Sequence, residues 1–235
     1  MNFCIFIPAY NAGQYLRETV GRIPEDVWRD VISVWIIDDG SRDDTAKAAD
    51  DLSRENPRIH AHHFPQNRGY GPAVKKGLAL CKNDGCDCAI CLHADGQYAP
   101  EMIPAFAAGL RDYDLMQGSR IASGTALSGG MPLYKFVANR ILTFFENIVF
   151  GLSLTDYHSG YLVYGRKALD TIVFERLSDS FDFDLEVIAS ARSRGLKIGE
   201  IPVQTRYAGE RSHVKSVEYG VRCLRVMGKY ILGQY

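Results

Sequence analysis

The stretch VISVWIIDDGSRDDT, residues 31–45, decides the fold. Its first part, VISVWIID, is apolar on both faces, which is typical of a parallel strand covered by helices on each side. A polar turn follows at once, and the spacing of Ser41 and Asp44 is that of a capping box, which predicts a helix start. Small and apolar residues then recur at helical spacing. The stretch therefore predicts a buried strand that leads through a turn into a helix.

The same alternation continues on both sides of this stretch. Further strands are predicted at 3–8, 59–64, 86–93 and 113–120, and further helices at 12–23, 71–81 and 100–110. Asn11 stands at the start of the first of these helices, and Pro100 stands in the first turn of the last one. Strands that alternate with helices in this way predict an α/β fold with a Rossmann-like, doubly wound, mostly parallel sheet flanked by helices.

The second half of the chain has a different pattern. Residues 124–130 are rich in glycine, 132–152 carry apolar residues at helical spacing, 181–195 predict another helix, and 196–207 predict a strand. We expect most of the 132–152 helix to pack in the core. A membrane-facing surface with aromatic side chains in the lipid is the alternative for the same helix. No repeat or low-complexity linker divides the chain, so one domain is expected over 1–235.

Composition narrows the class of protein. The chain is 46% hydrophobic and 23% charged, with a formal net charge of −1, which argues against a broad surface for nucleic acid. The first residues, MNFCIFIPAYN, lack the pattern of a signal peptide. No run reaches the ~18 apolar residues that a membrane-spanning helix needs. We therefore expect a cytoplasmic protein.

Four of the six cysteines cluster at Cys81, Cys86, Cys88 and Cys91, with His93 close behind, and they raise the alternative of a zinc site. On a strand, Cys86 and Cys88 would share one face and Cys91 would lie on the other. Zinc needs ligands that converge from four directions, which a straight strand does not provide. We therefore expect reduced, buried thiols at these positions.

Polar motifs follow four of the predicted strands: PAYN, DDGS, NRGYG and HADGQ. Local turn chemistry explains any one of them, but four at corresponding strand ends indicate a ligand site, since open parallel sheets bind ligands there. A dinucleotide-binding oxidoreductase would need a glycine-rich fingerprint after the first strand. The chain has PAYNAGQ at that place, which argues against this class.

Together these segments resemble the family 2 glycosyltransferases with the GT-A fold. The matching segments are IPAYN (7–11), IIDDGSRDDT (36–45), NRGYG (67–71), HADGQY (93–98), GSR (118–120) and DYHSGYLVYGRKAL (156–169). Within that family the chain is most similar to the polyprenyl-phosphate sugar transferases, the group of dolichyl-phosphate mannose synthase. The resemblance implies a nucleotide-sugar part at about 1–120 and an acceptor part at about 121–235.

The HADGQ segment is the predicted metal site. Asp95 and Gln97 are two residues apart on a chain that we expect to be extended, so their oxygens would face the same way. Such a pair can hold Mg²⁺ or Mn²⁺ against a diphosphate. His93 stands where the family usually has an aspartate, and it is open whether this residue is a ligand, a supporting group or a simple polar residue at a strand end.

The resemblance also implies a nucleotide site for a GDP- or UDP-linked sugar. Its predicted residues are Pro8, Tyr10, Asn11, Asp38, Asp39, Ser41, Asn67, Gly69 and, at the diphosphate, Asp95. An acidic side chain there can accept a hydrogen bond from the ring N–H of uracil or guanine. The family's usual glutamate after this first motif is Ala12 in this chain.

The predicted catalytic residues are Asp95, Arg120 and Asp156, and the reaction is an inverting displacement at the anomeric carbon. A hydroxyl nucleophile needs a carboxylate base, for which Asp156 is the candidate, whereas a phosphomonoester is already ionised at neutral pH. The candidates for binding phosphate are Arg120, Lys135, Arg140, Arg206 and Arg211.

From these considerations we predict a polyprenyl phosphate as the acceptor and a peripheral position on the cytoplasmic face of a membrane. A transferase that uses a hydroxyl acceptor, for a polysaccharide or glycolipid, is the main alternative because it would share every donor-site residue. A nucleotidyltransferase or a non-catalytic sugar-nucleotide binder is the more distant one. The nucleotidyltransferase would need lysine and glycine at the first strand end, where PAYNAG has no lysine.

Overall fold

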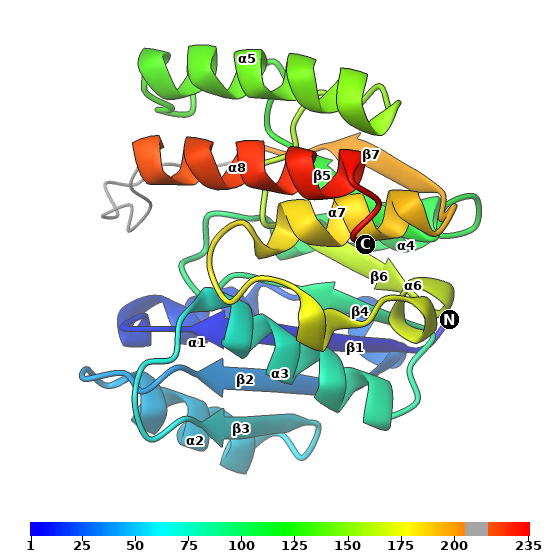
Figure 1. The fold of residues 1–235 in the computed structure, drawn as a ribbon. Coiled ribbons are helices and arrows are strands. Elements are labelled where there is room, and N and C mark those ends of the chain that lie inside the picture. Colours follow the sequence, from blue (N-terminus) through cyan, green and yellow to red (C-terminus); the bar gives the residue numbers. More distant parts are fainter. Residues whose placement is uncertain (205–215) are drawn as a thin grey trace.

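The computed structural model describes residues 1–204 and 216–235, which form a seven-stranded sheet between two layers of helices (Figure 1). The sheet has the order β3-β2-β1-β4-β6-β5-β7, in which β6 runs antiparallel to both of its neighbours and all other pairs are parallel. The strands are β1 (Phe3–Ala9), β2 (Val31–Asp38), β3 (Ile59–His63), β4 (Cys88–Cys91), β5 (Leu115–Ser119), β6 (Leu162–Gly165) and β7 (Ile198–Pro202).

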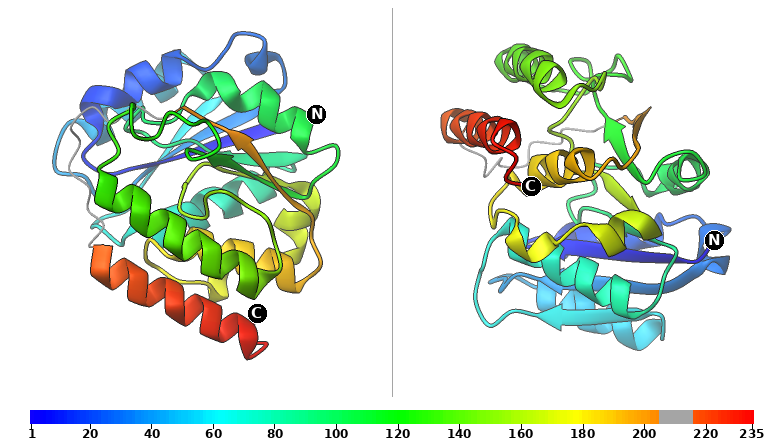
Figure 2. Two further views of the ribbon diagram at one scale, coloured as in Figure 1. Left: turned by 90° about the horizontal axis from the view of Figure 1, so that it is seen from above. Right: turned by 45° about the vertical axis from the view of Figure 1, so that its right-hand side comes forward.

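Helices cover both faces of this sheet (Figure 2). One core packs α1 (Gly13–Gly21), α2 (Thr45–Glu55) and α4 (Ile103–Gly109) on the sheet. The other core lies under α3 (Tyr70–Asn83), α6 (Arg166–Thr171) and α7 (Phe183–Ser193), and it extends to α5 (Leu133–Phe150) and α8 (Ser216–Ile231). Short 3₁₀ turns occur at Val27–Arg29, Pro100–Met102 and Phe174–Arg176. The predicted doubly wound, mostly parallel sheet is confirmed.

Two predicted helix caps are wrong in detail. The first helix begins at Gly13, so Asn11 lies outside it with a left-handed φ of 50° and accepts a hydrogen bond from the backbone N of Arg42 at 2.9 Å. The helix after β2 begins only at Thr45, and the Ser41 hydroxyl accepts from the backbone N of Asn11 at 3.0 Å. Both side chains join the loops after β1 and β2, because these neighbouring strands bring the loops together.

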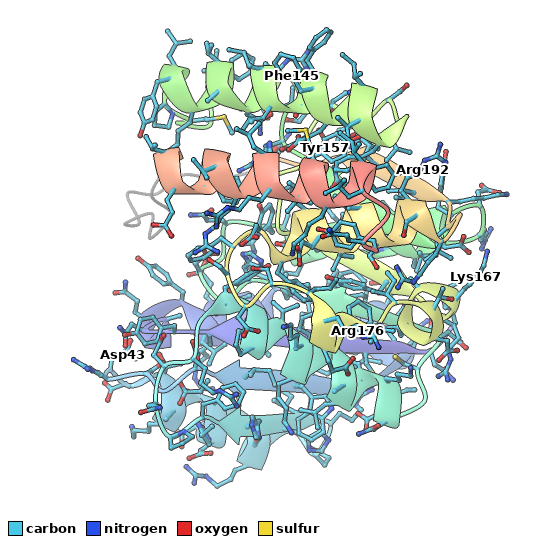
Figure 3. All side chains as sticks on the ribbon, in the orientation of Figure 1. Asp43, Phe145, Tyr157, Lys167, Arg176 and Arg192 are labelled. Carbon is cyan, nitrogen blue, oxygen red and sulfur yellow. The ribbon has the colours of Figure 1, made fainter. Side chains whose placement is uncertain are left out.

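The long helix α5 shows the largest departure from the sequence expectation. We expected most of its apolar stripe in the core, and that is wrong, because its apolar side chains face outward (Figure 3, where Phe145 is labelled). The exposed set is Leu133, Tyr134, Val137, Ile141, Phe144, Phe145 and Ile148. Its buried positions are Asn139, Thr143, Glu146 and Phe150, of which three are polar. Helical spacing shows that a stripe exists but does not show which way it faces.

A second exposed apolar surface lies beside this one. The helices α5 and α8 pack side by side (Figures 1 and 2), and α8 exposes Val217, Val221, Leu224 and Ile231. Among the described residues, no helix has both the length and the apolar character that crossing a bilayer requires. Side chains of this size rarely gather on the outside of a globular protein without a partner or a lipid surface.

The six cysteines are reduced and buried, but one of them lies elsewhere than we expected. Because β4 begins at Cys88, Cys86 precedes the strand and does not follow its alternation. Cys86 packs in the same core as Cys81 and Cys91, while Cys88 packs in the core on the opposite face. The prediction that Cys86 and Cys88 share a face is therefore wrong.

Candidate active site

The loops after β1, β2, β4 and β5 border one cavity of about 940 Å³ at the carboxyl ends of these strands, where ligands bind in open parallel sheets. Helix α5 and the segment 158–160 border it on the opposite side. The predicted site residues that line it are Pro8, Tyr10, Asp39, Asn67, Gly69, His93, Asp95, Gln97, Arg120 and Lys135. The predicted residues Asn11, Asp38, Ser41, Arg140 and Asp156 are not part of the lining, and Arg206 and Arg211 lie outside the described residues.

Asp39 organises one wall of the cavity. Its carboxylate accepts hydrogen bonds from the backbone N of Arg68 at 2.7 Å and of Gly69 at 2.9 Å. Burial raises the pKa of Asp39, although these two hydrogen bonds oppose the shift. The adjoining Gly40 has a φ of 65°, and an added Cβ would lie 2.4 Å from the carbonyl carbon of Gln66. Only glycine allows the two loops to approach this closely.

Asp38 lies behind this wall. Its Oδ1 accepts a hydrogen bond from the backbone N of Ser41 at 3.0 Å, and its Oδ2 lies 3.0 Å from Nδ1 of His63. Burial opposes a charge on His63, but the contacts with Asp38 and Asp50 outweigh it and raise the pKa of the ring. Asp38 therefore stabilises the loop after β2 from its buried side. A direct role of Asp38 in nucleotide binding stays a prediction.

The predicted metal corner has a turn where we expected an extended chain. Residues 94–96 form the turn, in which Gly96 has a φ of 70° and Asp95 Oδ1 accepts a hydrogen bond from the backbone N of Gln97 at 3.0 Å. The expectation of an extended segment is wrong because β4 ends at Cys91, and an aspartate side chain favours a turn by bonding the backbone two residues on. Asp95 and Gln97 still line the cavity, and carboxylate and amide oxygens are ligands that a hard cation prefers.

His93 is held by protein contacts behind this corner. Its Nε2 lies 3.4 Å from the Tyr70 hydroxyl, and its ring stands edge-on to Tyr98 with 5.1 Å between the centroids. Gly160 packs against the imidazole, since an added Cβ would lie 2.6 Å from Cε1 of the ring. Burial lowers the pKa of His93, so the ring is neutral at physiological pH. These contacts favour a supporting role for His93 over direct ligation.

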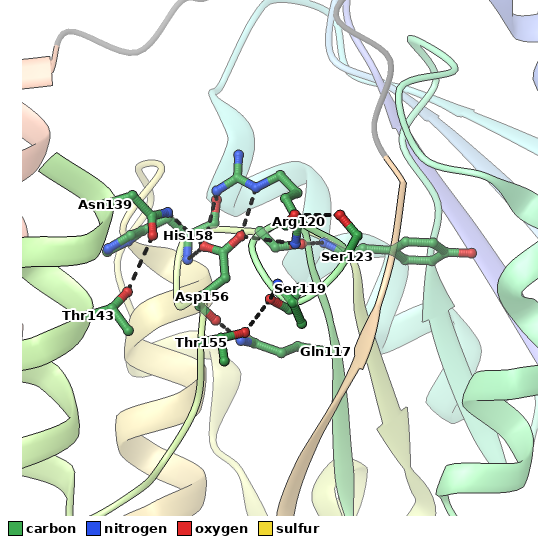
Figure 4. A network of polar contacts seen from close by, with 12 residues as sticks. Gln117, Ser119, Arg120, Ser123, Asn139, Thr143, Thr155, Asp156 and His158 are labelled. Carbon is green, nitrogen blue, oxygen red and sulfur yellow. Dashed lines mark hydrogen bonds and ion pairs between the residues drawn. The ribbon is translucent and has the colours of Figure 1, made fainter. Parts of the chain in front are cut away.

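The opposite wall is built around a buried ion pair between Arg120 and Asp156 (Figure 4). Arg120 follows β5, and its Nε and Nη2 donate to Asp156 at 2.8 and 3.1 Å, while Nη2 also donates to the carbonyl of His158 at 2.8 Å. Asp156 accepts further hydrogen bonds from the Asn139 amide at 2.8 Å and from the backbone N of His158 at 2.9 Å. The network fixes the guanidinium at the edge of the cavity.

Asp156 is therefore unsuited to act as a base. It is fully buried, and burial alone would raise its pKa, but the neighbouring Arg120 outweighs that cost and holds the pKa well below its usual range. Both oxygens already accept hydrogen bonds. A base must be able to take a proton from a bound nucleophile, and this carboxylate neither lines the cavity nor has the basicity to do so. This geometry argues against Asp156 as a base, and its catalytic role stays a prediction.

A different carboxyl, which the sequence did not single out, does line the cavity. Asp184 stands in the first turn of α7 and accepts a hydrogen bond from the Tyr70 hydroxyl at 2.8 Å. Its Oδ1 has no hydrogen-bond partner among the described residues, and burial raises its pKa to about 7. The available signal was an aspartate between apolar neighbours in the run FDFDLEVIA, whose helical residues are buried.

His158 and Tyr219 also line the cavity and were not predicted. The Tyr219 hydroxyl lies 3.0 Å from Nδ1 of His158, which links α8 to the segment that follows Asp156. Burial opposes a charge on His158, but Glu146 outweighs it and raises the pKa of the ring to about 10. His158 belongs to the quoted segment DYHSGY, whereas residues 216–231 were not predicted as a helix, so the sequence could not reveal the partner.

Comparison with known proteins shows the family of the chain. The model of Glycosyl transferase family 2 matches residues 4–173. The chain belongs to this family. An undecaprenyl-phosphate mannosyltransferase of Micrococcus luteus is 29% identical over 86% of this chain and 83% of its own length. A UDP-N-acetylglucosamine–dolichyl-phosphate N-acetylglucosaminyltransferase of Methanococcus voltae is 30% identical over 86% of this chain and 85% of its own. The chain is accordingly a nucleotide-sugar-dependent glycosyltransferase.

Solved structures support the same fold. Glucosyl-3-phosphoglycerate synthase from Mycobacterium tuberculosis, crystallised with Mn²⁺ and UDP-glucose, superimposes with a TM-score of 0.71 at 18% identity, and the match covers 99% of this chain and 78% of that one. At this identity the likeness shows the GT-A fold and not a shared substrate. The predicted family, enzyme class and fold are confirmed.

Proposed function

We propose that this glycosyltransferase transfers a sugar from a GDP- or UDP-linked donor to a polyprenyl phosphate, with inversion at the anomeric carbon. The observation that carries the proposal is the state of Asp156, which is buried, saturated with hydrogen bonds and held ionised by Arg120. A site whose predicted base is unavailable suits a nucleophile that needs none. A phosphomonoester has a second pKa near ~6 and is already an anion at neutral pH.

Two cations at the cavity suit the phosphate of such an acceptor. The Arg120 guanidinium is fixed at the cavity edge by Asp156, and Lys135 lines the cavity from the first turn of α5. Arg140 lies on the same helix but is exposed and outside the lining, so it is not expected to touch the phosphate. Charge-assisted hydrogen bonds of this kind are about twice as strong as neutral ones.

The apolar face of α5 suits the lipid part of the acceptor. It begins beside Lys135 and continues through Ile141, Phe144 and Ile148, whose side chains are 54, 61 and 64% exposed. An amphipathic helix with such a face lies in the interfacial layer of a bilayer, with its cations at the head groups. We therefore propose a peripheral position on the cytoplasmic face of a membrane, where the relatives' named lipid acceptors would be found.

The residues at the β4 corner fit a divalent cation. Asp95 and Gln97 provide oxygen donors at the cavity, which are the ligands that Mg²⁺ and Mn²⁺ prefer. Such an ion, when bound, would stabilise the negative charge of the departing nucleoside diphosphate. The chain's own contribution is to hold Asp95 in its turn and to support the corner from behind with His93.

A hydroxyl acceptor is the second candidate, because Asp184 favours it. This carboxyl lines the cavity and has a pKa of about 7, so it could accept a proton from a sugar hydroxyl near neutral pH. In that enzyme Asp184 would be the base, and the phosphate group of a lipid acceptor would be unnecessary. The two functions therefore differ in how activity depends on Asp184 and on the acceptor's phosphate.

The test uses radiolabelled UDP- and GDP-sugars with polyprenyl phosphate or with the matching polyprenol. We expect transfer to polyprenyl phosphate only, and we expect the Asp184→Asn variant to keep substantial activity. Equal or better transfer to the polyprenol, lost in Asp184→Asn, would replace the proposal with the hydroxyl-directed enzyme. Co-sedimentation with vesicles that contain anionic lipid tests the membrane surface, and binding should fall in the double variant Phe144→Ser, Phe145→Ser.

A further inference from the structure

A buried cluster of three side chains lies where α5, α8 and the segment after Asp156 meet. Glu146 contributes a carboxylate from α5, His158 an imidazole from the segment, and Cys223 a thiol from α8. One ligand atom from each lies within 4.8 Å of the other two, and Glu146 Oε2 is 3.3 Å from His158 Nε2. Among the described residues this is the one group of three such side chains with that convergence.

Three polar atoms of this cluster lack hydrogen bonds within the described residues. Glu146 is fully buried, and within the described residues neither of its carboxylate oxygens accepts a hydrogen bond, nor is Nε2 of His158 hydrogen-bonded. The 3.3 Å contact is close enough for an ion pair, but its geometry is not that of a hydrogen bond. Buried polar atoms that make no hydrogen bond are costly. The two carboxylate oxygens and Nε2 converge with a thiol, which indicates that a ligand is missing between them.

We propose that Glu146, His158 and Cys223 bind a zinc ion. Bonds of about 2.0–2.3 Å in a tetrahedral site place neighbouring ligand atoms about 3.3–3.8 Å apart, and the carboxylate–imidazole distance already falls in that range. A carboxylate and a thiolate together balance the charge of Zn²⁺, which suits a buried position. Water would complete the tetrahedron as the fourth ligand.

The surroundings support this assignment. The Tyr219 hydroxyl lies 3.0 Å from Nδ1 of His158 and thereby directs Nε2 toward Glu146 and Cys223, as partners of metal-binding histidines commonly do. A thiolate ligand selects zinc over magnesium or manganese. This site therefore differs in chemistry from the oxygen donors at Asp95 and Gln97, and it does not depend on the proposed acceptor.

Histidine and cysteine bind zinc in their deprotonated forms, so zinc binding would release protons and its affinity should rise with pH. It would join α5 and α8 to the segment whose backbone N and carbonyl bind Asp156 and Arg120. The ion would thus fix the two helices with exposed apolar faces against the cavity wall.

The experiment measures metal content and ligation directly. The full chain is purified without chelators, treated with one equivalent of Zn²⁺ or Co²⁺ under reducing conditions, and freed of loose metal by gel filtration. One zinc per chain by elemental analysis is expected, with one sulfur at about 2.3 Å and nitrogen or oxygen at about 2.0 Å by X-ray absorption. The Co²⁺ form should show a thiolate charge-transfer band in the near ultraviolet.

Variants then assign the ligands. Cys223→Ser should lose the charge-transfer band, and Glu146→Gln should weaken zinc binding. Cys86→Ser, a matched change of another buried cysteine, should keep both the band and the zinc. Asp95→Asn should also keep the zinc, which separates this site from the predicted metal corner. The proposal is overturned if wild-type protein retains less than a tenth of an equivalent of zinc per chain, or if its X-ray absorption spectrum shows no sulfur ligand. The cluster would then be a buried ion pair only. This measurement needs no variant to fold.

Discussion

The two walls of the cavity are held together in opposite ways. The wall built from β1, β2 and the 66–69 loop is held by hydrogen bonds from backbone N atoms to a side chain, such as those that Asp39 accepts from Arg68 and Gly69. The wall built from β5, α5 and the segment after Asp156 depends on contacts between buried side chains, with Arg120 and Asn139 both bonded to Asp156. Turn chemistry positions the first wall, whereas buried charge positions the second.

The largest effect is expected at the corner between these walls. Asp95→Asn would remove the proposed negative oxygen ligand of the metal, so transfer should fall by at least about a hundredfold, because a metal that stabilises a leaving group contributes several kcal/mol. Isothermal titration of a nucleoside diphosphate with and without Mn²⁺ provides the second measurement, in which the metal-dependent part of binding should disappear. Metal-independent binding that is the same in both proteins would contradict the assignment of this corner.

The second effect tests the buried charge of the acceptor wall. Arg120→Ala leaves Asp156 buried without its main partner, so the free energy of unfolding should fall by about 3–5 kcal/mol. The double variant Arg120→Ala, Asp156→Asn should recover much of that stability but not the transfer to polyprenyl phosphate. Urea unfolding and the transfer assay measure the two quantities separately.

A matched exposed pair gives the control. Arg17 and Glu55 form a bidentate ion pair on the surface, and Arg17→Ala should lower the free energy of unfolding much less than Arg120→Ala, because exposed ion pairs contribute little. If Arg120→Ala were as mild as Arg17→Ala, Asp156 would not be the organising charge of the wall. If the double variant kept full transfer to polyprenyl phosphate, the proposed role of Arg120 at the acceptor phosphate would be wrong.

The same contrast explains what the sequence could predict. Strands β1 to β5 and the polar loops after them follow from residue periodicity and turn residues, which act over short distances. The outward face of α5 does not follow, because the buried Asn139 meets its partner Asp156 only when the segment after α5 folds back against the helix. The antiparallel strand β6 also went unpredicted.

Asp184 gives the third expected effect, through pH. Its pKa is raised from 3.8 to about 7 in the folded chain, so the folded state keeps a proton that the unfolded state releases. The contribution of Asp184 to the free energy of unfolding is therefore fully present below about pH 4 and is lost as the pH rises through 7. Asp184→Asn, which resembles the protonated form, should be more stable than wild type by a few kcal/mol at about pH 8 and by less at about pH 5.

Urea unfolding at both pH values measures this difference, and Asp112→Asn, a change of an exposed aspartate, controls for the loss of one surface charge. A stability difference for Asp184→Asn that did not grow with pH would show that Asp184 is ionised in the folded chain. In that case Asp184 would no longer qualify as a base for a hydroxyl acceptor near neutral pH.

The smallest effect separates two cations on one helix. Lys135 lines the cavity and Arg140 does not, although they are close in sequence and both were candidates for binding phosphate. Losing one charge-assisted contact costs ~1.5–3 kcal/mol, so Lys135→Ala should raise the KM for polyprenyl phosphate about ten- to a hundredfold and leave the KM for the nucleotide sugar unchanged.

Arg140→Ala is the control, and it should change neither KM by more than about twofold, because exposed charges contribute little. Steady-state kinetics with the acceptor in detergent micelles measures both variants without the contribution of the membrane surface. Equal effects of the two variants would mean that the wall recognises general positive charge and not a phosphate held at one position.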